Sequence, residues 1–116
     1  MSLFLHLGQD SLNILESCLA VPFSRFNKKD LYRGIVGKGS ILFYLLIKNH
    51  PFQNGNKRIA VMSLLYFLYK NGKWLYVPND KLYRFAKNVA ASKAHNREFV
   101  LRSIREFLAT NVRRLK

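Results

Sequence analysis

The sequence has few cysteines and no long apolar runs, the features typical of proteins from oxidising compartments and of membrane-spanning proteins. It contains one cysteine, Cys18, among 116 residues, which excludes a disulfide framework and a cysteine-based metal site. The apolar runs 41–47 and 59–69 are both shorter than the roughly 20 residues that a membrane-spanning helix requires. The first residues carry neither the basic region nor the cleavage site of a signal peptide. We therefore expect a cytoplasmic protein without a membrane partner.

Prolines are also scarce. Three prolines and a hydrophobic content of 49% argue against a disordered chain. A length of 116 residues is enough for one domain with a small core. We expect residues 1–116 to form a single domain, either as a whole protein or as a fragment of a longer one.

Acidic residues are few, and the resulting excess of positive charge has several interpretations. Twenty lysines and arginines oppose six acidic residues, which gives a net charge of +14. Such an excess fits a nucleic acid, an acidic protein partner or a nucleotide substrate, and it also fits a solvated surface without a ligand. Because the cations are spread along the chain, we expect a nucleotide or an acidic partner rather than a nucleic acid.

Residues 55–58 combine a tight turn with two cations at the start of a predicted helix. Gly55 and Asn56 permit a turn that directs backbone N–H groups at an anion. Lys57 and Arg58 follow in the first helical turn, where the helix dipole is positive. Cations in this position oppose the dipole, so the pattern indicates a phosphate or another anion that pairs with them.

The positions of the acidic residues indicate which side chain could act as a base. No aspartate or glutamate lies between Asp30 and Asp80, so a general base close to this turn has to be His50, which could take a proton from a hydroxyl. A metal ion there would need phosphates, water, or a carboxylate that the fold brings from elsewhere. Phe52 would anchor the loop in the core.

Hydrophobic periodicity predicts an all-α domain. Asp10 can cap a first helix, residues 21–38 resemble a loop, and the run 41–47 fits a buried strand or a buried helix. The helix 56–70 is apolar nearly all round, so we expect it to be the buried centre of a bundle. The further predicted elements are a glycine C-cap at Asn71-Gly72, an extended segment 73–78, a helix capped by Asn79, and a last helix from about Asn96 with Arg113, Arg114 and Lys116 in its final turn.

The stretch His50-Pro51-Phe52-Gln53-Asn54-Gly55-Asn56-Lys57-Arg58 resembles the signature of the Fic/Doc (death-on-curing) family. That signature runs His-x-Phe-x-(Asp/Glu)-(Gly/Ala)-Asn-(Gly/Lys)-Arg, so Asn54 stands where the family has an acid. Lys57 and Val61 fit the Doc-like branch, in which lysine replaces a glycine and a second arginine of Fic enzymes is absent. The order of the predicted helices also resembles that of Doc proteins.

The resemblance implies a small Fic/Doc-type helical bundle, with a short β-hairpin flap as an optional element. It further implies a toxin-type transferase that uses ATP to modify a protein hydroxyl, with elongation factor Tu as the favoured target and an antitoxin as partner. In this scheme His50 is the catalytic base, residues 55–58 bind the nucleotide phosphates, and position 54 holds Mg²⁺. Asn54 offers magnesium only a neutral carbonyl. AMP transfer and a catalytically degenerate binding module are therefore the alternatives.

Overall fold

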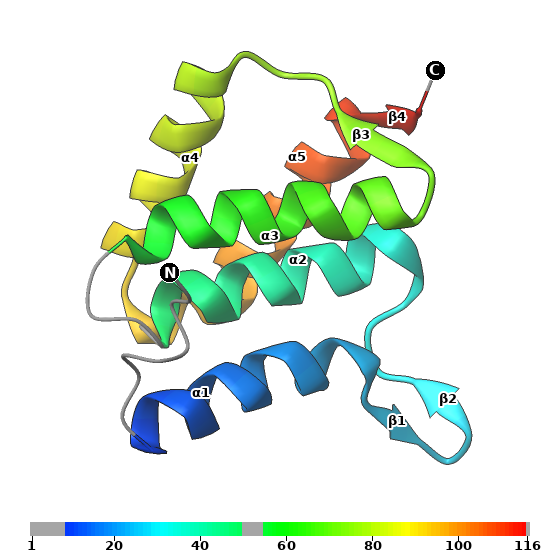
Figure 1. Cartoon of the computed structure of the whole chain (residues 1–116), viewed down its shortest axis with the longest axis vertical. Coiled ribbons are helices and arrows are strands. Elements are labelled where there is room, and N and C mark those ends of the chain that lie inside the picture. The colour runs from blue at the N-terminus through cyan, green and yellow to red at the C-terminus, as the bar shows by residue number, and fades with distance from the viewer. Residues whose placement is uncertain (1–8, 50–54, 116) are drawn as a thin grey trace.

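The structure, a computed structural model, describes residues 9–49 and 55–115. Within these residues the chain forms the α-helices α1 (Gln9–Ala20), α2 (Gly34–Lys48), α3 (Asn56–Lys70), α4 (Asn79–Ala91) and α5 (Arg97–Asn111). The shorter elements are the 3₁₀ turns η2 (Val21–Phe23) and η3 (Ala94–Asn96) and the strands β1 (Arg25–Phe26), β2 (Lys29–Asp30), β3 (Lys73–Leu75) and β4 (Val112–Arg114). The predicted all-α helical bundle is confirmed (Figure 1).

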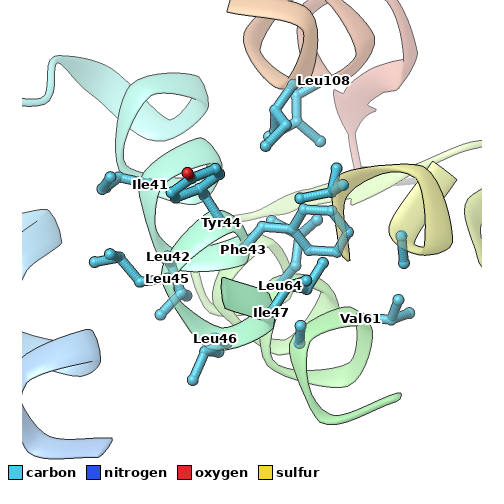
Figure 2. Close-up of a cluster of buried hydrophobic side chains, with 14 of the residues drawn as sticks. Ile41, Leu42, Phe43, Tyr44, Leu45, Leu46, Ile47, Val61, Leu64 and Leu108 are labelled. Atoms are coloured by element: carbon cyan, nitrogen blue, oxygen red, sulfur yellow. The ribbon is translucent and has the colours of Figure 1, made fainter. Parts of the chain in front are cut away.

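Helix α2 is the centre of the molecule. Every residue from 39 to 47 is buried, and Figure 1 shows α2 between α1 and α3, with α5 behind it. The run 41–47, which fitted a strand or a helix, is therefore helical. A helix can be apolar on every side when neighbours cover its whole circumference. The close-up in Figure 2 shows its side chains spreading in several directions, towards Val61 and Leu64 of α3 and towards Leu108 of α5.

The prediction that helix 56–70 forms the buried centre is wrong. The buried residues of α3 are Ala60, Val61, Leu64 and Leu68, which lie along one stripe of the helix. Met62, Tyr66 and Tyr69 are exposed. An apolar composition shows that a helix can be buried, but it does not show how many sides have neighbours. That depends on how distant segments pack.

A glycine allows the central helices to approach closely. A Cβ atom at Gly39 of α2 would lie 3.2 Å from Leu64 Cδ1, which is tighter than ordinary van der Waals contact, and 3.5 Å from Leu108 Cδ1, which is an ordinary contact. The absence of a side chain therefore lets α3 pack closely against this turn of α2, which α5 also contacts. Next to this contact, Phe85 of α4 stacks on Phe107 of α5 with ring centroids 4.2 Å apart.

The end of the chain forms a strand instead of a last helical turn. Helix α5 ends at Asn111, and β4 pairs antiparallel with β3. Arg113 and Arg114 therefore do not lie in a helix as predicted, and Lys116 lies outside the described residues. The predicted glycine C-cap of α3 is confirmed, because Gly72 follows the helix with a φ of 71°. Its backbone carbonyl accepts a hydrogen bond from the N–H of Leu115 at 2.9 Å.

The predicted first residues of three helices differ slightly from the observed ones. Asp10 lies in the first turn of α1 and not before it. Asn79 is the first residue of α4, preceded by Pro78. Asn96 does precede α5, as predicted, but its side chain forms no capping hydrogen bond. These shifts are the usual uncertainty of helix boundaries.

Much of the predicted loop 21–38 is regular. Strands β1 and β2 form a hairpin in which Phe26 pairs with Lys29, in agreement with the optional hairpin that the family resemblance implied. The hairpin is tied to α2 because Lys38 Nζ donates a hydrogen bond to Asp30 Oδ2 at 2.8 Å. This hydrogen bond and the charge of Lys38 lower the pKa of Asp30. The link therefore contributes stability above the ordinary aspartate pKa and is lost as pH falls through the lowered value.

In the part of the chain that the structure describes, no helix is both long and apolar enough to cross a membrane.

Candidate functional site

The first turn of α3 is the place where the sequence predicts an anion site. Gly55 precedes the helix with φ 75° and ψ 20°, and its carbonyl accepts the N–H of Ile59 at 2.9 Å. A Cβ atom at Gly55 would meet nothing within 4 Å, so the left-handed backbone and not lack of space favours glycine here. The N-cap residue, Gly55, has no side chain with which to cap the helix. The backbone N–H groups of a first helical turn have no carbonyl four residues earlier in the helix to bind.

Two cations face solvent at this helix start. Lys57 and Arg58 are exposed, and Asn56 beside them is partly buried. Neither cation forms an ion pair with a residue that the structure describes, and the first turn of α3 contains no acidic residue. Two positive side chains thus stand at the positive end of a helix dipole. A phosphate or another anion is the kind of ligand that such an arrangement can bind.

Three predicted site residues, His50, Phe52 and Asn54, lie outside the described residues. Their assigned roles as base, loop anchor and metal ligand remain predictions. Of the predicted set, the structure brings residues 55–58 together in one helical turn.

The residues just before position 50 are fixed by contacts that sequence reasoning missed. Lys48 Nζ, in the last turn of α2, donates hydrogen bonds to Ser92 O and, at 3.2 Å, to Ala90 O. These carbonyls lie at the C-terminal end of α4, where the helix dipole favours a cation. The Asn49 side chain donates to Cys18 Sγ at 3.8 Å. The C-terminal end of α2 is therefore attached to both α4 and α1, and nothing in the local sequence signals either contact.

Cys18 has a structural role. Its side chain is buried, and Cys18 Sγ lies 3.5 Å from Leu45 O, to which it donates. Burial raises the pKa of the Cys18 thiol, with the hydrogen bond from Asn49 acting in the opposite direction. The group stays protonated and unreactive at neutral pH.

We expect Lys48→Met to lower the free energy of unfolding by about 1.5–3 kcal/mol, because hydrogen bonds to a charged donor are lost while the apolar stem is kept. Chemical denaturation of both proteins measures this. Lys87→Met on α4 is the matched control, since Lys87 is exposed and should change stability by about 0.5 kcal/mol or less. Equal stability of the two variants would show that the contacts with Ala90 and Ser92 are unimportant.

The two acidic residues nearest to the signature in the sequence both form ion pairs with basic side chains. Asp30 pairs with Lys38 and Arg25, and Asp80 lies 3.7 Å from Arg84. Asp80 is at the start of α4, whereas Lys48 contacts its other end. Among the described residues no group of three or more His, Cys, Asp or Glu could hold a metal ion. The described part of the site presents cations and N–H donors, which suit an anion and do not suit Mg²⁺.

An apolar groove of about 650 Å³ runs beside the same helix. Ile59, in the first turn of α3, lies at one end of the lining and Lys70, the last residue of α3, at the other. The remaining lining residues are Leu19, Phe23, Leu42, Met62, Ser63, Tyr66 and Phe67. The lining is apolar apart from Ser63 and Lys70, and the groove begins one residue after Arg58.

Comparison with known proteins agrees with the geometry. Residues 7–68 match the model of the Fic/DOC family, which spans α1, α2, the loop and nearly all of α3. Searches of curated proteins and of solved structures found no match. Because the matched region covers more than half of the chain, the protein belongs to the Fic/DOC family, whose members are in general nucleotide-using transferases.

Proposed function

We propose that this protein is a Doc-like transferase that uses ATP to phosphorylate a hydroxyl group of a target protein. The observation that carries the proposal is the first turn of α3, where Lys57 and Arg58 are exposed without a described acidic partner. Together with the left-handed Gly55, they form a cationic turn with N–H donors. Such a turn suits the triphosphate of a nucleotide.

The chain's own residues would contribute positioning, charge and proton transfer. His50 takes the proton from the attacking hydroxyl, whose oxygen bonds to the γ-phosphorus while the bond to the bridging oxygen breaks and ADP leaves. Residues 55–58 hold the phosphates and stabilise the negative charge that spreads over the transferred group. The hydrogen bonds of Lys48 and Asn49 fix the end of α2 from which the His50 loop departs. Since the described residues do not fit a magnesium site, no step is assigned to the metal.

Phosphate transfer is favoured over AMP transfer because of two positions. Lys57 replaces the glycine of Fic enzymes, and Val61 occupies the place of their second arginine. Val61 is 2% exposed and faces the core, so this position presents no charge to a ligand.

Incubation with doubly labelled ATP and a cell lysate tests the proposal. Label from the γ-phosphate on a protein supports a kinase, whereas label from the adenine means AMP transfer. If neither label is transferred while ATP still binds, the protein is a degenerate nucleotide-binding module. Purified elongation factor Tu is the first target to assay, because the resemblance to Doc implies it.

We expect Asn54→Asp to raise turnover about tenfold, which corresponds to about 1.4 kcal/mol of transition-state stabilisation. A carboxylate at this position gives Mg²⁺ a charged oxygen in place of a neutral carbonyl. Turnover and Mg²⁺ affinity should be measured on both proteins, with Asn88→Asp as a control that adds a charge at an exposed position of α4, outside the signature. If the Asn54→Asp variant binds Mg²⁺ and still transfers no label, the signature segment 50–58 no longer supports catalysis.

An antitoxin is the proposed protein partner. The groove beside α3 supports this, because it is apolar, open to solvent and close to the cationic turn. A segment bound there would lie next to the nucleotide and could block access of the target.

A further inference from the structure

The ribbon formed by β3 and β4 has two distinct faces. Trp74 lies directly opposite Arg113. The N–H of Tyr76 donates to Asn111 O at 3.0 Å, which continues the same register by one step beyond the end of β3. Residues directly opposite each other, and residues two apart along a strand, share a face. Trp74, Tyr76 and Arg113 therefore lie on one face of the ribbon.

This face is turned away from the core. Leu75, which lies on the other face, is 3% exposed and belongs to the core. Tyr76 is 46% exposed, Arg113 is exposed and Trp74 is partly buried. Figure 1 shows the ribbon beside the C-terminal end of α3. The cationic turn is at the other end of this 15-residue helix, roughly 20 Å away along its axis.

The ribbon gathers cations that are far apart in the sequence. Lys73 lies directly opposite Arg114, and like charges in such a pair destabilise a sheet. Arg113 Nη1 donates to the backbone carbonyl of its neighbour Val112 at 2.7 Å, which does not neutralise its charge. None of these three cations forms an ion pair in the part of the chain that the structure describes. The sequence has no acidic residue between positions 30 and 80 or after position 106, so the ribbon is strongly basic.

We propose that the β3–β4 ribbon binds single-stranded nucleic acid, whose bases stack on Trp74 and Tyr76. Lys73, Arg113 and Arg114 hold the phosphates. Proteins that bind single strands without sequence preference combine aromatic rings for the bases with cations for the backbone. The spread of cations along the sequence argued against a nucleic acid, but the strand register brings residues 73–76 and 113–114 together.

An acidic protein segment and double-stranded DNA fit this face less well. Carboxylates would pair with the cations, but they would leave the two aromatic rings without a matching group. The bases of a duplex are stacked on one another, so they are not free to stack on a side chain. The ribbon lies at the far end of α3 from the cationic turn, and the proposal does not depend on the transferase activity.

The fluorescence of Trp74 tests the proposal on the whole chain, because this residue is the one tryptophan of the sequence. We expect an oligothymidine of about 12 nucleotides to quench this fluorescence, since a base stacks on the indole ring. About three phosphate contacts predict a slope of about −2 for the logarithm of affinity against the logarithm of salt concentration. A duplex of the same length should bind more weakly and without quenching.

Two pairs of variants separate stacking from charge. Tyr76→Ala should weaken binding about tenfold, because one stacked base is lost, whereas Phe99→Ala, at a 70% exposed aromatic residue of α5, should bind like the unmodified protein. Arg113→Ala should make the salt slope shallower by about 0.7, and Arg113→Lys should restore it because the charge is kept. Arg102→Ala, at an exposed arginine of α5, should leave the slope unchanged.

The outcomes distinguish this site from general attraction to a basic protein. Quenching that depends on Tyr76 and Arg113, and not on Phe99 and Arg102, supports the proposal. Binding without quenching, equal effects of the alanine variants at 102 and 113, or tighter binding of the duplex or of polyglutamate would overturn it. Lys57→Ala should bind the oligonucleotide like the unmodified protein, so failure of this site and failure of the ATP site are separate results.

Discussion

Replacing His50 with alanine is expected to abolish transfer of the labelled phosphate while leaving ATP binding in place. A general base contributes about 10²–10⁴-fold to such a reaction, and between Asp30 and Asp80 the sequence contains no carboxylate that could take over. The described acids Asp30 and Asp80 are paired with basic side chains. Single-turnover transfer to the identified target measures the loss, and calorimetric titration with ATP shows that the nucleotide site persists.

The control for this variant is His95→Ala. His95 lies in η3 and is exposed, so its removal should leave transfer unchanged. Both variants should keep the unfolding free energy within about 1 kcal/mol of the unmodified protein, since neither alters a buried core residue that the structure describes. Undiminished transfer by the alanine variant at position 50 would refute the assignment of the base.

Lys57→Ala and Arg58→Ala should each weaken ATP binding about 10-fold to 150-fold. Each substitution removes a charge-assisted contact worth about 1.5–3 kcal/mol, and neither side chain has a described ion pair that would be lost at the same time. Calorimetric titration with ATP gives the affinities. Adenosine should bind the variants and the unmodified protein alike, because it has no phosphate.

Lys70→Ala is the matched control for the two cations. Lys70 is an exposed lysine at the other end of the same helix, so it tests for a general effect of net charge. If all three variants bind ATP as the unmodified protein does, the phosphates lie elsewhere. Lys57→Gly carries one more expectation, a shift of the transferred label from γ-phosphate towards AMP.

The sequence predicted the fold class and the turns at two glycines well. Gly55 and Gly72 were identified because a left-handed backbone strongly favours glycine, and both have the positive φ values of 75° and 71°. The turn at Asn27 and Lys28 escaped prediction because it lacks the glycine that normally signals it. Local residue preference therefore identifies a turn that contains the usual glycine and misses a turn in which another residue takes the place of glycine.

Contacts between distant parts of the chain could not be predicted. The link from Lys48 to the end of α4 joins residues 42 and 44 positions apart, and β3 pairs with a strand that follows α5. The identity of the central helix depends on such contacts as well. Both α2 and α3 are apolar, and α2 is enclosed because α5 and α4 pack on the side that α1 and α3 leave open.

Because helices from both halves of the chain enclose α2, the segment that matches the family model is shorter than the segment needed for folding. The matched region ends at residue 68, but Leu108 of α5 packs on α2 near Gly39, and Phe85 of α4 stacks on Phe43 of α2 with centroids 6.3 Å apart. A fragment cut at residue 68 would contain the entire signature and still expose one flank of the buried, largely apolar segment 39–47, which favours aggregation. The C-terminal helices therefore complete the core that supports the signature. They are free to change sequence as long as they supply apolar volume at those contacts.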